Sequence, residues 1–173
     1  MKIILCNKNH LKDLTEFYNK VVLNLEKTIN YPHWVYGIYP CELTINEAIN
    51  KNQQYACIEN GKIIGGFVLN EDPGGKIENA KIKFKRGEFL VIHTLATDVD
   101  ICRKGVASKM IKFCEEKAKN DGYKAIYADV VPTNIPSQNL FKKCGFTYLG
   151  DFDLERTFDK SIPLFSIYEL ELQ

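Results

Sequence analysis

The sequence has few of the features that mark membrane proteins, secreted proteins and nucleic-acid-binding proteins. It has no uninterrupted apolar run long enough to span a bilayer, and its start, MKIILCNKNHLKDL, turns polar after six residues, too early for a secretory signal. Lysine and arginine number 23 against 22 aspartate and glutamate residues, so no overall charge favours nucleic acid or an anionic membrane. We therefore expect a cytoplasmic protein that binds a small molecule, with no nucleic-acid partner and no membrane partner.

The chain also lacks paired cysteines. None of its six cysteines forms a C-x-x-C pair with another, which argues against both a zinc site and a redox dithiol. We expect reduced, mostly buried thiols and no bound metal. The cysteines are Cys6, Cys41, Cys57, Cys102, Cys114 and Cys144.

The apolar residues that are present suffice for one compact domain, since they make up 45% of the 173 residues. Apolar residues recur at helical spacing from about residue 9 to 28, which predicts an amphipathic helix. The aromatic-rich stretch INYPHWVYGIYP, residues 29–40, interrupts the helical pattern with two prolines and a glycine. A short helix is predicted to open at Thr44, with Glu47 at the capping-box spacing.

The middle of the chain predicts a hairpin followed by a loop. Two apolar runs flank Asn60-Gly61, a dipeptide that strongly favours a tight turn between antiparallel strands. Residues 71–87 are polar and contain Pro73-Gly74-Gly75, so we expect an exposed excursion there.

The second half predicts parallel strands. A long apolar strand over 88–99, a helix over 103–120 and a strand over 124–131 form a unit that requires a right-handed crossover. A short helix within 135–146, with Pro136 in its first turn and Gly145 just past its end, and an antiparallel strand pair within 146–172 follow. The predicted fold is α/β (α+β): a mixed, mostly antiparallel sheet with a central parallel strand pair, flanked by helices.

The segment CRKGVASKM, residues 102–110, lies where the long strand gives way to the helix. Free N–H groups at a helix start, together with the positive end of the helix dipole, bind anions. The small or cationic residues at this point suit a phosphate or pyrophosphate, and they are Arg103, Lys104, Gly105, Ala107 and Ser108. A helix that merely begins with small residues and two solvated cations is the alternative. The segment matches neither G-x-x-x-x-G-K-[ST] nor G-x-G-x-x-G.

Two segments together resemble the signatures of the GCN5-related N-acetyltransferases (GNAT family). LATDVDICRKGVASKMI is similar to the signature in which Leu-Ala-Val ends a strand and [QR]-x-x-G-x-[GA] opens a helix. NIPSQNLFKKCGF is similar to the later signature, an Asn followed by a short helix and a closing Gly-Phe. The resemblance covers roughly residues 55–150 and implies a single acetyltransferase domain over 1–173. It further implies a helical acceptor-side region at 1–54, an acetyl-CoA-binding core at 55–150 and a C-terminal strand within 151–173.

The resemblance also implies where acetyl-CoA binds. Its pyrophosphate would lie on the backbone amides of residues 103–108, and its pantetheine arm would pair with strand backbone near Leu95 and Thr97, between two splayed parallel strands. The N–H of Ala96 would polarise the thioester carbonyl, and Asn134 would contact the arm unless it only caps its helix. The implied cofactor-binding residues are Leu95, Ala96, Thr97, Arg103, Lys104, Gly105, Val106, Ala107, Ser108, Asn134 and Phe141.

Three residues depart from the family pattern. Cys102 occupies the Gln/Arg position, so any side-chain contribution to pyrophosphate binding falls to Arg103 or Lys104. Phe141 stands where many relatives carry a Tyr that protonates the leaving thiolate, and a phenyl ring cannot donate a proton. Thr97 replaces the common Val, which is a mild change because the backbone does the binding.

The implied reaction is direct attack, in a ternary complex, by a primary amine of a small molecule or a peptide terminus. His93, two residues before Leu95, is the candidate base, and a packed strand histidine is the alternative reading. Tyr31, Trp34 and Tyr36 are candidate acceptor contacts, and hydrophobic packing under a loop is the alternative for each. The missing Tyr leaves open a non-catalytic acyl-CoA-binding or sensing module, and the sequence also leaves a homodimer open.

Overall fold

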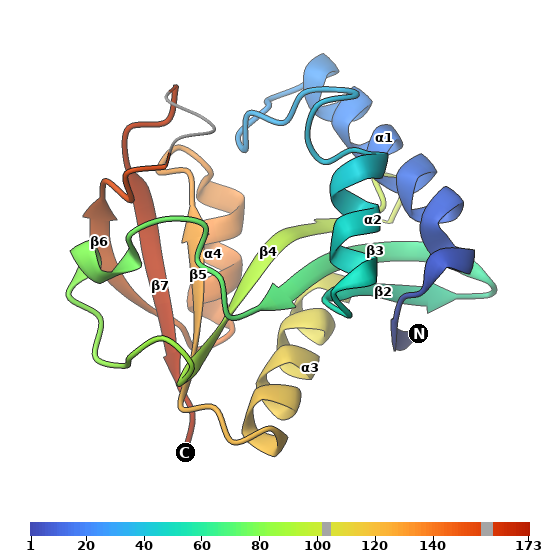
Figure 1. Cartoon of the computed structure of the whole chain (residues 1–173). Coiled ribbons are helices and arrows are strands. Elements are labelled where there is room, and N and C mark those ends of the chain that lie inside the picture. The colour runs from blue at the N-terminus through green and yellow to red at the C-terminus, as the bar shows by residue number, and fades with distance from the viewer. Residues whose placement is uncertain (102–104, 157–160) are drawn as a thin grey trace. The chain divides into compact units, whose positions relative to one another are not determined.

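The computed structural model describes residues 1–101, 105–156 and 161–173, and it contains a seven-stranded mixed sheet in the order β1-β2-β3-β4-β5-β7-β6 (Figure 1). The chain divides into two compact units, the first with Met1–Leu69 and His93–Met110 and the second with Asn70–Ile92 and Ile111–Gln173. The elements are β1 (Lys2–Leu5), η1 (Lys8–His10), α1 (Leu11–Lys27), α2 (Glu42–Asn50), β2 (Gln54–Glu59), β3 (Lys62–Asn70), η2 (Ile77–Ala80), β4 (Phe89–Thr97), α3 (Val106–Asn120), β5 (Ala125–Val130), α4 (Ile135–Lys143), β6 (Thr147–Phe152) and β7 (Phe165–Glu171).

In the first unit, β1, β2 and β3 pair antiparallel, and α1 and α2 supply apolar side chains to a core that includes Ala56 of β2. Helix α1 buries one stripe at the spacing expected of an amphipathic helix, namely Leu14, Phe17, Tyr18, Val21 and Val22. The turn between β2 and β3 is the predicted Asn60-Gly61, with φ of 50° and 73°. These left-handed angles match the twist of the flanking strands, which confirms the hairpin.

In the second unit, β4 and β5 are parallel, and their ladder runs from Phe89–Ala125 to Ile92–Ala128. Strand β7 pairs antiparallel with β5 on one side and with β6 on the other. The predicted parallel pair and the predicted antiparallel C-terminal pair are therefore both confirmed. The single acetyltransferase domain over residues 1–173, with regions divided near residues 54 and 150, stays a prediction.

In the N-terminal part of the chain one predicted helix start was wrong and one strand was missed. The short helix α2 begins one turn earlier than expected: its N-cap is Cys41, and Thr44 is the third helical residue. The Thr44 hydroxyl accepts a hydrogen bond of 3.0 Å from the Cys41 backbone N–H, so Thr44 fills the returning position of the capping box rather than opening it. Strand β1 was not predicted at all, because four residues carry too little pattern.

The excursion at 71–87 is less exposed than its polar composition predicts. Ile77 and Ala80 are buried in the core of the second unit together with Leu154. Gly75, within this excursion, lies so close to Leu154 that a Cβ at position 75 would stand 2.5 Å from the Leu154 carbonyl oxygen. The Lys76 N–H donates to the same carbonyl at 2.7 Å. The excursion therefore forms part of the core layer, with Gly75 permitting the backbone approach.

Of the cysteines in the described part of the chain, Cys6, Cys57 and Cys114 are buried, and Cys41 and Cys144 are half-buried. All five are free thiols, as predicted. Burial raises the pKa of the Cys6 thiol to about 12 and also raises the pKa of Cys114. A thiol that keeps its proton at neutral pH is a poor nucleophile, which fits a packing role.

A buried ion pair ties three segments of the second unit together. The Arg156 guanidinium donates to both carboxylate oxygens of Asp129, each at 2.7 Å, and to the Pro73 carbonyl at 2.8 Å. Its Cζ atom lies 4.4 Å from the centre of the Phe165 ring. The Arg156 side chain is only 7% exposed, so this paired, bidentate geometry offsets the cost of burying its charge.

We expect Arg156→Met to lower the free energy of unfolding by about 3 kcal/mol, because it leaves the Asp129 carboxylate buried without its partner. Urea denaturation measures this loss. The double variant Arg156→Met/Asp129→Leu removes both charges and should recover most of the stability. A single variant as stable as the wild type, or a double variant worse than the single one, would contradict this account of the ion pair.

Candidate functional site

Strand β4 has an unusual residue at its centre. Thr94 has a φ of +49°, in the left-handed region that β-branched residues seldom adopt. A residue of this conformation interrupts the regular alternation of side chains, as in a β-bulge. The inference that His93 and Leu95 share a face assumed regular alternation, and that assumption is not met at Thr94. Ala96 is buried in the core of the first unit, while Leu95 and Thr97 are half-buried.

The Tyr18 side chain of α1 reaches this position in β4. Its hydroxyl donates a hydrogen bond of 3.0 Å to the Thr94 carbonyl, and Tyr18 is almost fully buried. The Tyr18 ring packs edge-on against Phe17, with centroids 5.0 Å apart, and against Trp34, at 6.2 Å. Trp34 comes from the aromatic segment 29–40, so α1 links that segment to the backbone of β4.

After β4 the chain makes a tight turn that α1 also contacts. The Asp98 carboxylate accepts a hydrogen bond of 2.9 Å from the Asp100 N–H, and the Ile101 N–H donates to the Asp98 carbonyl at 3.0 Å. The Lys20 ammonium lies 2.7 Å from a carboxylate oxygen of Asp98 and 2.7 Å from one of Asp100. This arrangement fixes the chain just before the segment that contains the predicted anion site.

Helix α3 begins at Val106, directly after Gly105, and its first turn contains no acidic residue. Gly105 has a φ of +72°, and among the described residues no atom beyond its chain neighbours lies within 4 Å of where a Cβ would stand. The helix start packs on β3, where a Cβ at Gly65 would lie 2.8 Å from the Met110 sulfur and 3.2 Å from Val106. Cys102, Arg103 and Lys104 lie outside the described residues.

The other predicted residues of the first unit lie on β4 and in the α1–α2 connection. His93 is half-buried and directly precedes Thr94. Tyr31 and Trp34 are half-buried, whereas Tyr36 is 51% exposed. The connection is held by Asn30, whose side chain donates to the Trp34 carbonyl at 2.7 Å and accepts from the Trp34 N–H at 3.0 Å.

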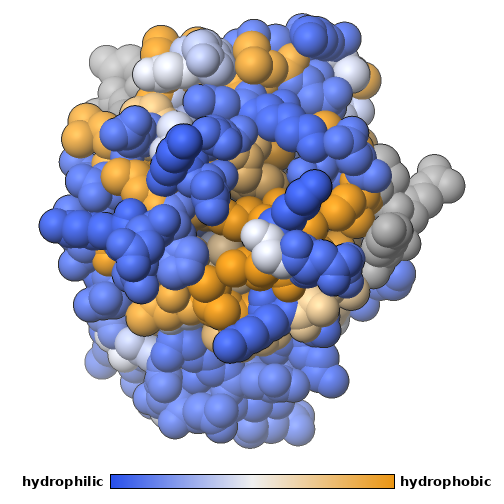
Figure 2. Space-filling view, turned by 90° about the vertical axis from the view of Figure 1, so that its right-hand side faces the viewer, coloured by the Kyte–Doolittle hydropathy of each residue, from blue (hydrophilic) through white to orange (hydrophobic). Residues whose placement is uncertain are grey.

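The same connection exposes several large apolar side chains. They are Ile29, Val35, Tyr36, Ile38, Tyr39 and, at the start of α2, Leu43. Figure 2 shows apolar side chains interspersed with hydrophilic ones on the face that lies to the right in Figure 1. Exposed apolar residues in a short connection suit contact with a ligand or with another molecule.

Two predicted cofactor residues, Asn134 and Phe141, lie in the second unit. Asn134 is the N-cap of α4, and its side-chain oxygen accepts a hydrogen bond of 3.2 Å from the Ser137 N–H. The side-chain NH2 group of Asn134 would therefore be the part that contacts the cofactor arm. Phe141 is buried, with its ring centre 5.1 Å from Phe146 and 6.0 Å from Tyr168. The predicted site residues thus fall into two groups, one in each unit.

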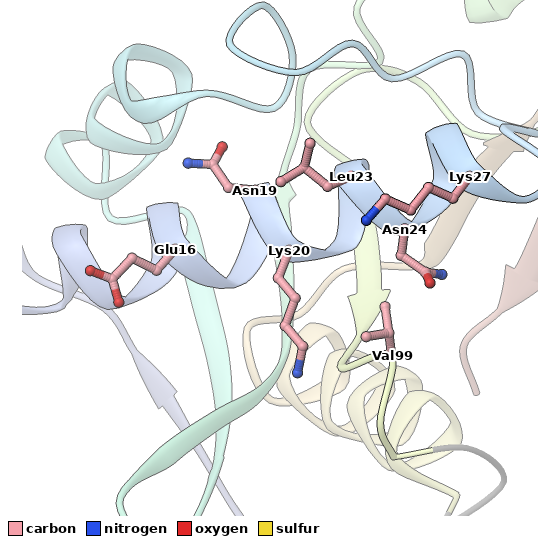
Figure 3. Close-up of a pocket in the computed structure, with 7 residues that line it drawn as sticks. All are labelled: Glu16, Asn19, Lys20, Leu23, Asn24, Lys27 and Val99. Atoms are coloured by element: carbon pink, nitrogen blue, oxygen red, sulfur yellow. The ribbon is translucent and has the colours of Figure 1, made fainter.

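A surface hollow of about 490 Å³ lies along α1 in the first unit (Figure 3). Side chains of α1 line most of it, and Val99, two residues after β4, completes it. None of its lining residues was predicted from the sequence as a site residue. The lining residues are Glu16, Asn19, Lys20, Leu23, Asn24, Lys27 and Val99.

Within residues 1–101, 105–156 and 161–173 no three His, Cys, Asp or Glu side chains gather where they would bind a metal ion. Nor does any helix in the same ranges combine the length and apolar character that a bilayer span requires.

The sequence was compared with models of protein families. Residues 20–146 match the model of the Acetyltransferase (GNAT) family, which covers most of the chain and both segments with signature-like residues. The chain belongs to the GNAT acetyltransferase family. The predicted family is therefore confirmed, and with it the mixed, mostly antiparallel sheet with a parallel β4–β5 pair that GNAT folds share.

Solved structures of other acetyltransferases share this GNAT fold. A Staphylococcus aureus Mu50 protein classed with the acetyltransferases is 24% identical, with full coverage of both chains and a TM-score of 0.72. YncA from Salmonella typhimurium, solved with its cofactor acetyl-CoA, is 17% identical over 100% of this chain and 94% of that one, with a TM-score of 0.72. A ribosomal-protein-alanine N-acetyltransferase from Brucella melitensis is 13% identical over 99% and 100%, with a TM-score of 0.73.

The Lys20 ion pair predicts a pH dependence of stability. Burial acts to raise the pKa of Asp98, but the Lys20 ammonium and the Asp100 N–H outweigh it, so this pKa lies below its usual value. A carboxyl group whose pKa is lower in the folded state stabilises the protein above the unfolded pKa of about 3.9, and this stabilisation disappears as the pH falls through the folded pKa.

We expect Asp98→Asn to lower the free energy of unfolding by about 1 kcal/mol at pH 7 and by nothing at pH 2. The Asn side-chain oxygen can still accept from the Asp100 N–H, so the change isolates the charge. Urea denaturation across this pH range measures the difference. An equal loss at both pH values would mean that the turn, and not the ion pair, accounts for the effect.

Proposed function

We propose that this GNAT protein transfers an acetyl group from acetyl-CoA to a primary amine of a small molecule or a peptide terminus. The observation that carries the proposal is the order of the end of β4, the tight turn, left-handed Gly105 and the start of α3 within residues 93–110, which belong to one unit of a GNAT chain. The amine attacks directly in a ternary complex of protein, acetyl-CoA and acceptor. The relative YncA, solved with acetyl-CoA, supports the choice of acetyl donor.

The start of α3 suits the diphosphate of acetyl-CoA. The first N–H groups of a helix have no partner within it, and the positive end of the dipole favours an anion there. Gly105 leaves open the space that a side chain would fill, and Ala107 and Ser108 are small. Val106 is buried and packs on Gly65, so it contributes its backbone and anchors the helix start. Arg103 and Lys104 add positive charge in the same segment.

Strand β4 would hold the rest of the molecule. Backbone groups of Leu95 and Thr97 pair with the pantetheine arm as a neighbouring strand would, while the N–H of Ala96 or a neighbour donates to the thioester carbonyl. Asn134 and Phe141, which lie in the second unit, stay predicted cofactor residues on the strength of the family resemblance. Acetyl-CoA supplies an acetyl group already activated as a thioester.

The transfer forms a carbon–nitrogen bond and breaks a carbon–sulfur bond. The amine must lose a proton, and the thiolate that leaves must gain one, so the reaction needs a proton acceptor and a proton source. His93 is the proposed acceptor, directly or through water, because histidine titrates near neutral pH. Phe141 has no proton to give, so water or another hydroxyl protonates the thiolate. Holding the reactants together supplies most of the acceleration.

The connection between α1 and α2 is the proposed acceptor contact. Tyr31, Trp34 and Tyr36 provide aromatic surface, which binds apolar groups and cations. A peptide N-terminus remains within this proposal because the Brucella melitensis relative is named for acting on a ribosomal-protein alanine. The proposal includes a cytoplasmic location, and it is compatible with a homodimer.

The diphosphate site is tested by a pair of substitutions at Gly105. Asp and Asn both tolerate a positive φ better than other side chains, and they differ from each other only in charge. We expect Gly105→Asp to weaken acetyl-CoA binding about 100-fold, and Gly105→Asn to weaken it far less, because a carboxylate repels the diphosphate. Isothermal titration calorimetry measures both. Wild-type affinity in folded Gly105→Asp would place the diphosphate elsewhere.

The proton acceptor is tested with His93→Ala in an assay of thiol release with a panel of amines. We expect turnover to fall about 10- to 100-fold and the acidic limb of the pH–rate profile to disappear, with acetyl-CoA affinity hardly changed. His10→Ala is the matched control, since His10 accepts a hydrogen bond from the Asn7 N–H at the start of α1. An unchanged profile in His93→Ala would make His93 a packing residue.

Two further outcomes of the same assay bear on the proposal. Phe141→Tyr should accelerate turnover only slightly, and a large gain would mean that protonation of the thiolate limits the rate. Binding of acetyl-CoA without thiol release for any amine of the panel would favour a non-catalytic acyl-CoA-binding module.

A further inference from the structure

We propose that Tyr18 is a positioning residue for the acetyl-donor strand: its hydroxyl fixes the peptide plane between Thr94 and Leu95. The proposal rests on the function proposed above, which assigns the backbone around Leu95 to cofactor binding. It concerns only residues of the first unit. Tyr18 touches no reacting atom in this account and acts through the backbone of β4.

The direction of the Leu95 N–H follows from the hydrogen bond of Tyr18. In a trans peptide the carbonyl and the N–H of one plane point in opposite directions. The Tyr18 hydroxyl donates to the Thr94 carbonyl at 3.0 Å, so this carbonyl points toward α1. The Leu95 N–H, which shares its plane, therefore points away from α1. One hydrogen bond thus determines which side of β4 presents this donor.

The conformation that Tyr18 stabilises is not one that Thr94 adopts readily. A β-branched residue at a φ of +49° is strained, and such strain persists only where the surroundings impose it. Without the hydroxyl, the Thr94 carbonyl would lose its partner in a buried place and the strand could relax toward regular alternation. Relaxation would rotate the Leu95 N–H and shift which groups of Leu95 and Ala96 face the acetyl donor.

The surroundings of Tyr18 are built to keep its hydroxyl in place. A Cβ at Gly66 would stand 2.8 Å from the Tyr18 hydroxyl oxygen and 3.2 Å from Cζ, so β3 leaves room for this one group. Phe17 and Trp34 pack against the ring. Burial raises the pKa of Tyr18 far above its usual value, while hydrogen bonds with Thr94 and Gln54 act the other way. The hydroxyl therefore keeps the proton that it donates.

The first test is Tyr18→Phe, which removes only the hydroxyl. We expect the Kd for acetyl-CoA to rise about tenfold, as for loss of one buried hydrogen bond that orders the site. Thr15→Val is the matched control: it removes a hydroxyl of the same helix that donates to the Leu11 carbonyl at 2.8 Å. Thr15→Val should bind acetyl-CoA like the wild type. Equal loss of affinity in both variants would mean that Tyr18 stabilises α1 in general and does not position β4.

The second test is rescue by glycine, which adopts a positive φ without strain. We expect the double variant Tyr18→Phe/Thr94→Gly to bind acetyl-CoA within about threefold of the wild type. Its loss of thermal stability should remain, since the buried hydroxyl is still absent. A role for Tyr18 in packing alone predicts no rescue, because Thr94→Gly restores no contact to position 18. Failure of the rescue overturns the proposal.

A measurement without cofactor separates this inference from the proposed function. We expect the amide NMR resonances of Leu95 and Ala96 to shift, and their hydrogen exchange to accelerate, in Tyr18→Phe and to return toward wild-type values in the double variant. If the wild type fails to bind acetyl-CoA but these amides respond as expected, the proposed function fails and the link from Tyr18 to β4 stands. Unchanged amides in Tyr18→Phe refute the link, whatever the activity.

Discussion

The hydrogen bond from the Tyr18 hydroxyl to the Thr94 carbonyl supports the strand that we propose for the acetyl donor. If β4 were a regular strand, its residues would point alternately to its two sides along its whole length. The left-handed Thr94 interrupts this alternation, and the Tyr18 side chain donates a hydrogen bond to Thr94 at that point. Since Trp34 packs on Tyr18, the proposed acceptor segment and the proposed donor strand share this support.

Adjacent glycines in β3 make the arrangement around β4 possible. Successive residues of a strand point to opposite faces, so Gly65 and Gly66 open space on the two sides of β3. A Cβ at Gly65 would collide with Met110 of α3, and one at Gly66 with the Tyr18 hydroxyl. The absence of two side chains thus lets the start of α3 approach from one face and Tyr18 from the other. The strand loses packing area and gains two close contacts that position the site.

The parts of the fold that the sequence predicted well are those decided by local rules. Asn60-Gly61 adopts left-handed angles that few other residue pairs tolerate. After residue 88 a helix connects two strands, and a connection of this length allows the strands to be parallel, whereas a short turn would make them antiparallel. The burial of the excursion was not predicted because it depends on a contact distant in sequence. Residues 71–87 are polar, yet Ile77 and Ala80 are buried because the segment packs on Leu154, about 75 positions later.

The candidate site shows the same division. Gly105 is recognisable in the sequence because a glycine at a strand-to-helix junction is a local signal, and its φ of +72° fits that reading. Thr94 gives no such signal, since threonine is typical of ordinary strands and rare at positive φ. Tyr18 was predicted only as one of several apolar residues on α1. The Thr94 carbonyl that accepts its hydrogen bond is 76 residues away in the sequence. Helical periodicity does not predict which group a side-chain hydroxyl contacts.

The packing of Phe141 explains why a family member can lack a Tyr at this position. Its ring is buried between Phe146 and Tyr168, so the side chain already contributes apolar packing to the second unit. A thiol has an ordinary pKa near 8.5, and most of the leaving group is therefore protonated at neutral pH once it reaches water. Proton donation to sulfur is thus the less demanding of the two proton transfers. An amine acceptor is mostly protonated at the same pH, so its deprotonation would present the larger barrier, and His93 of β4 is the group that we propose as the proton acceptor.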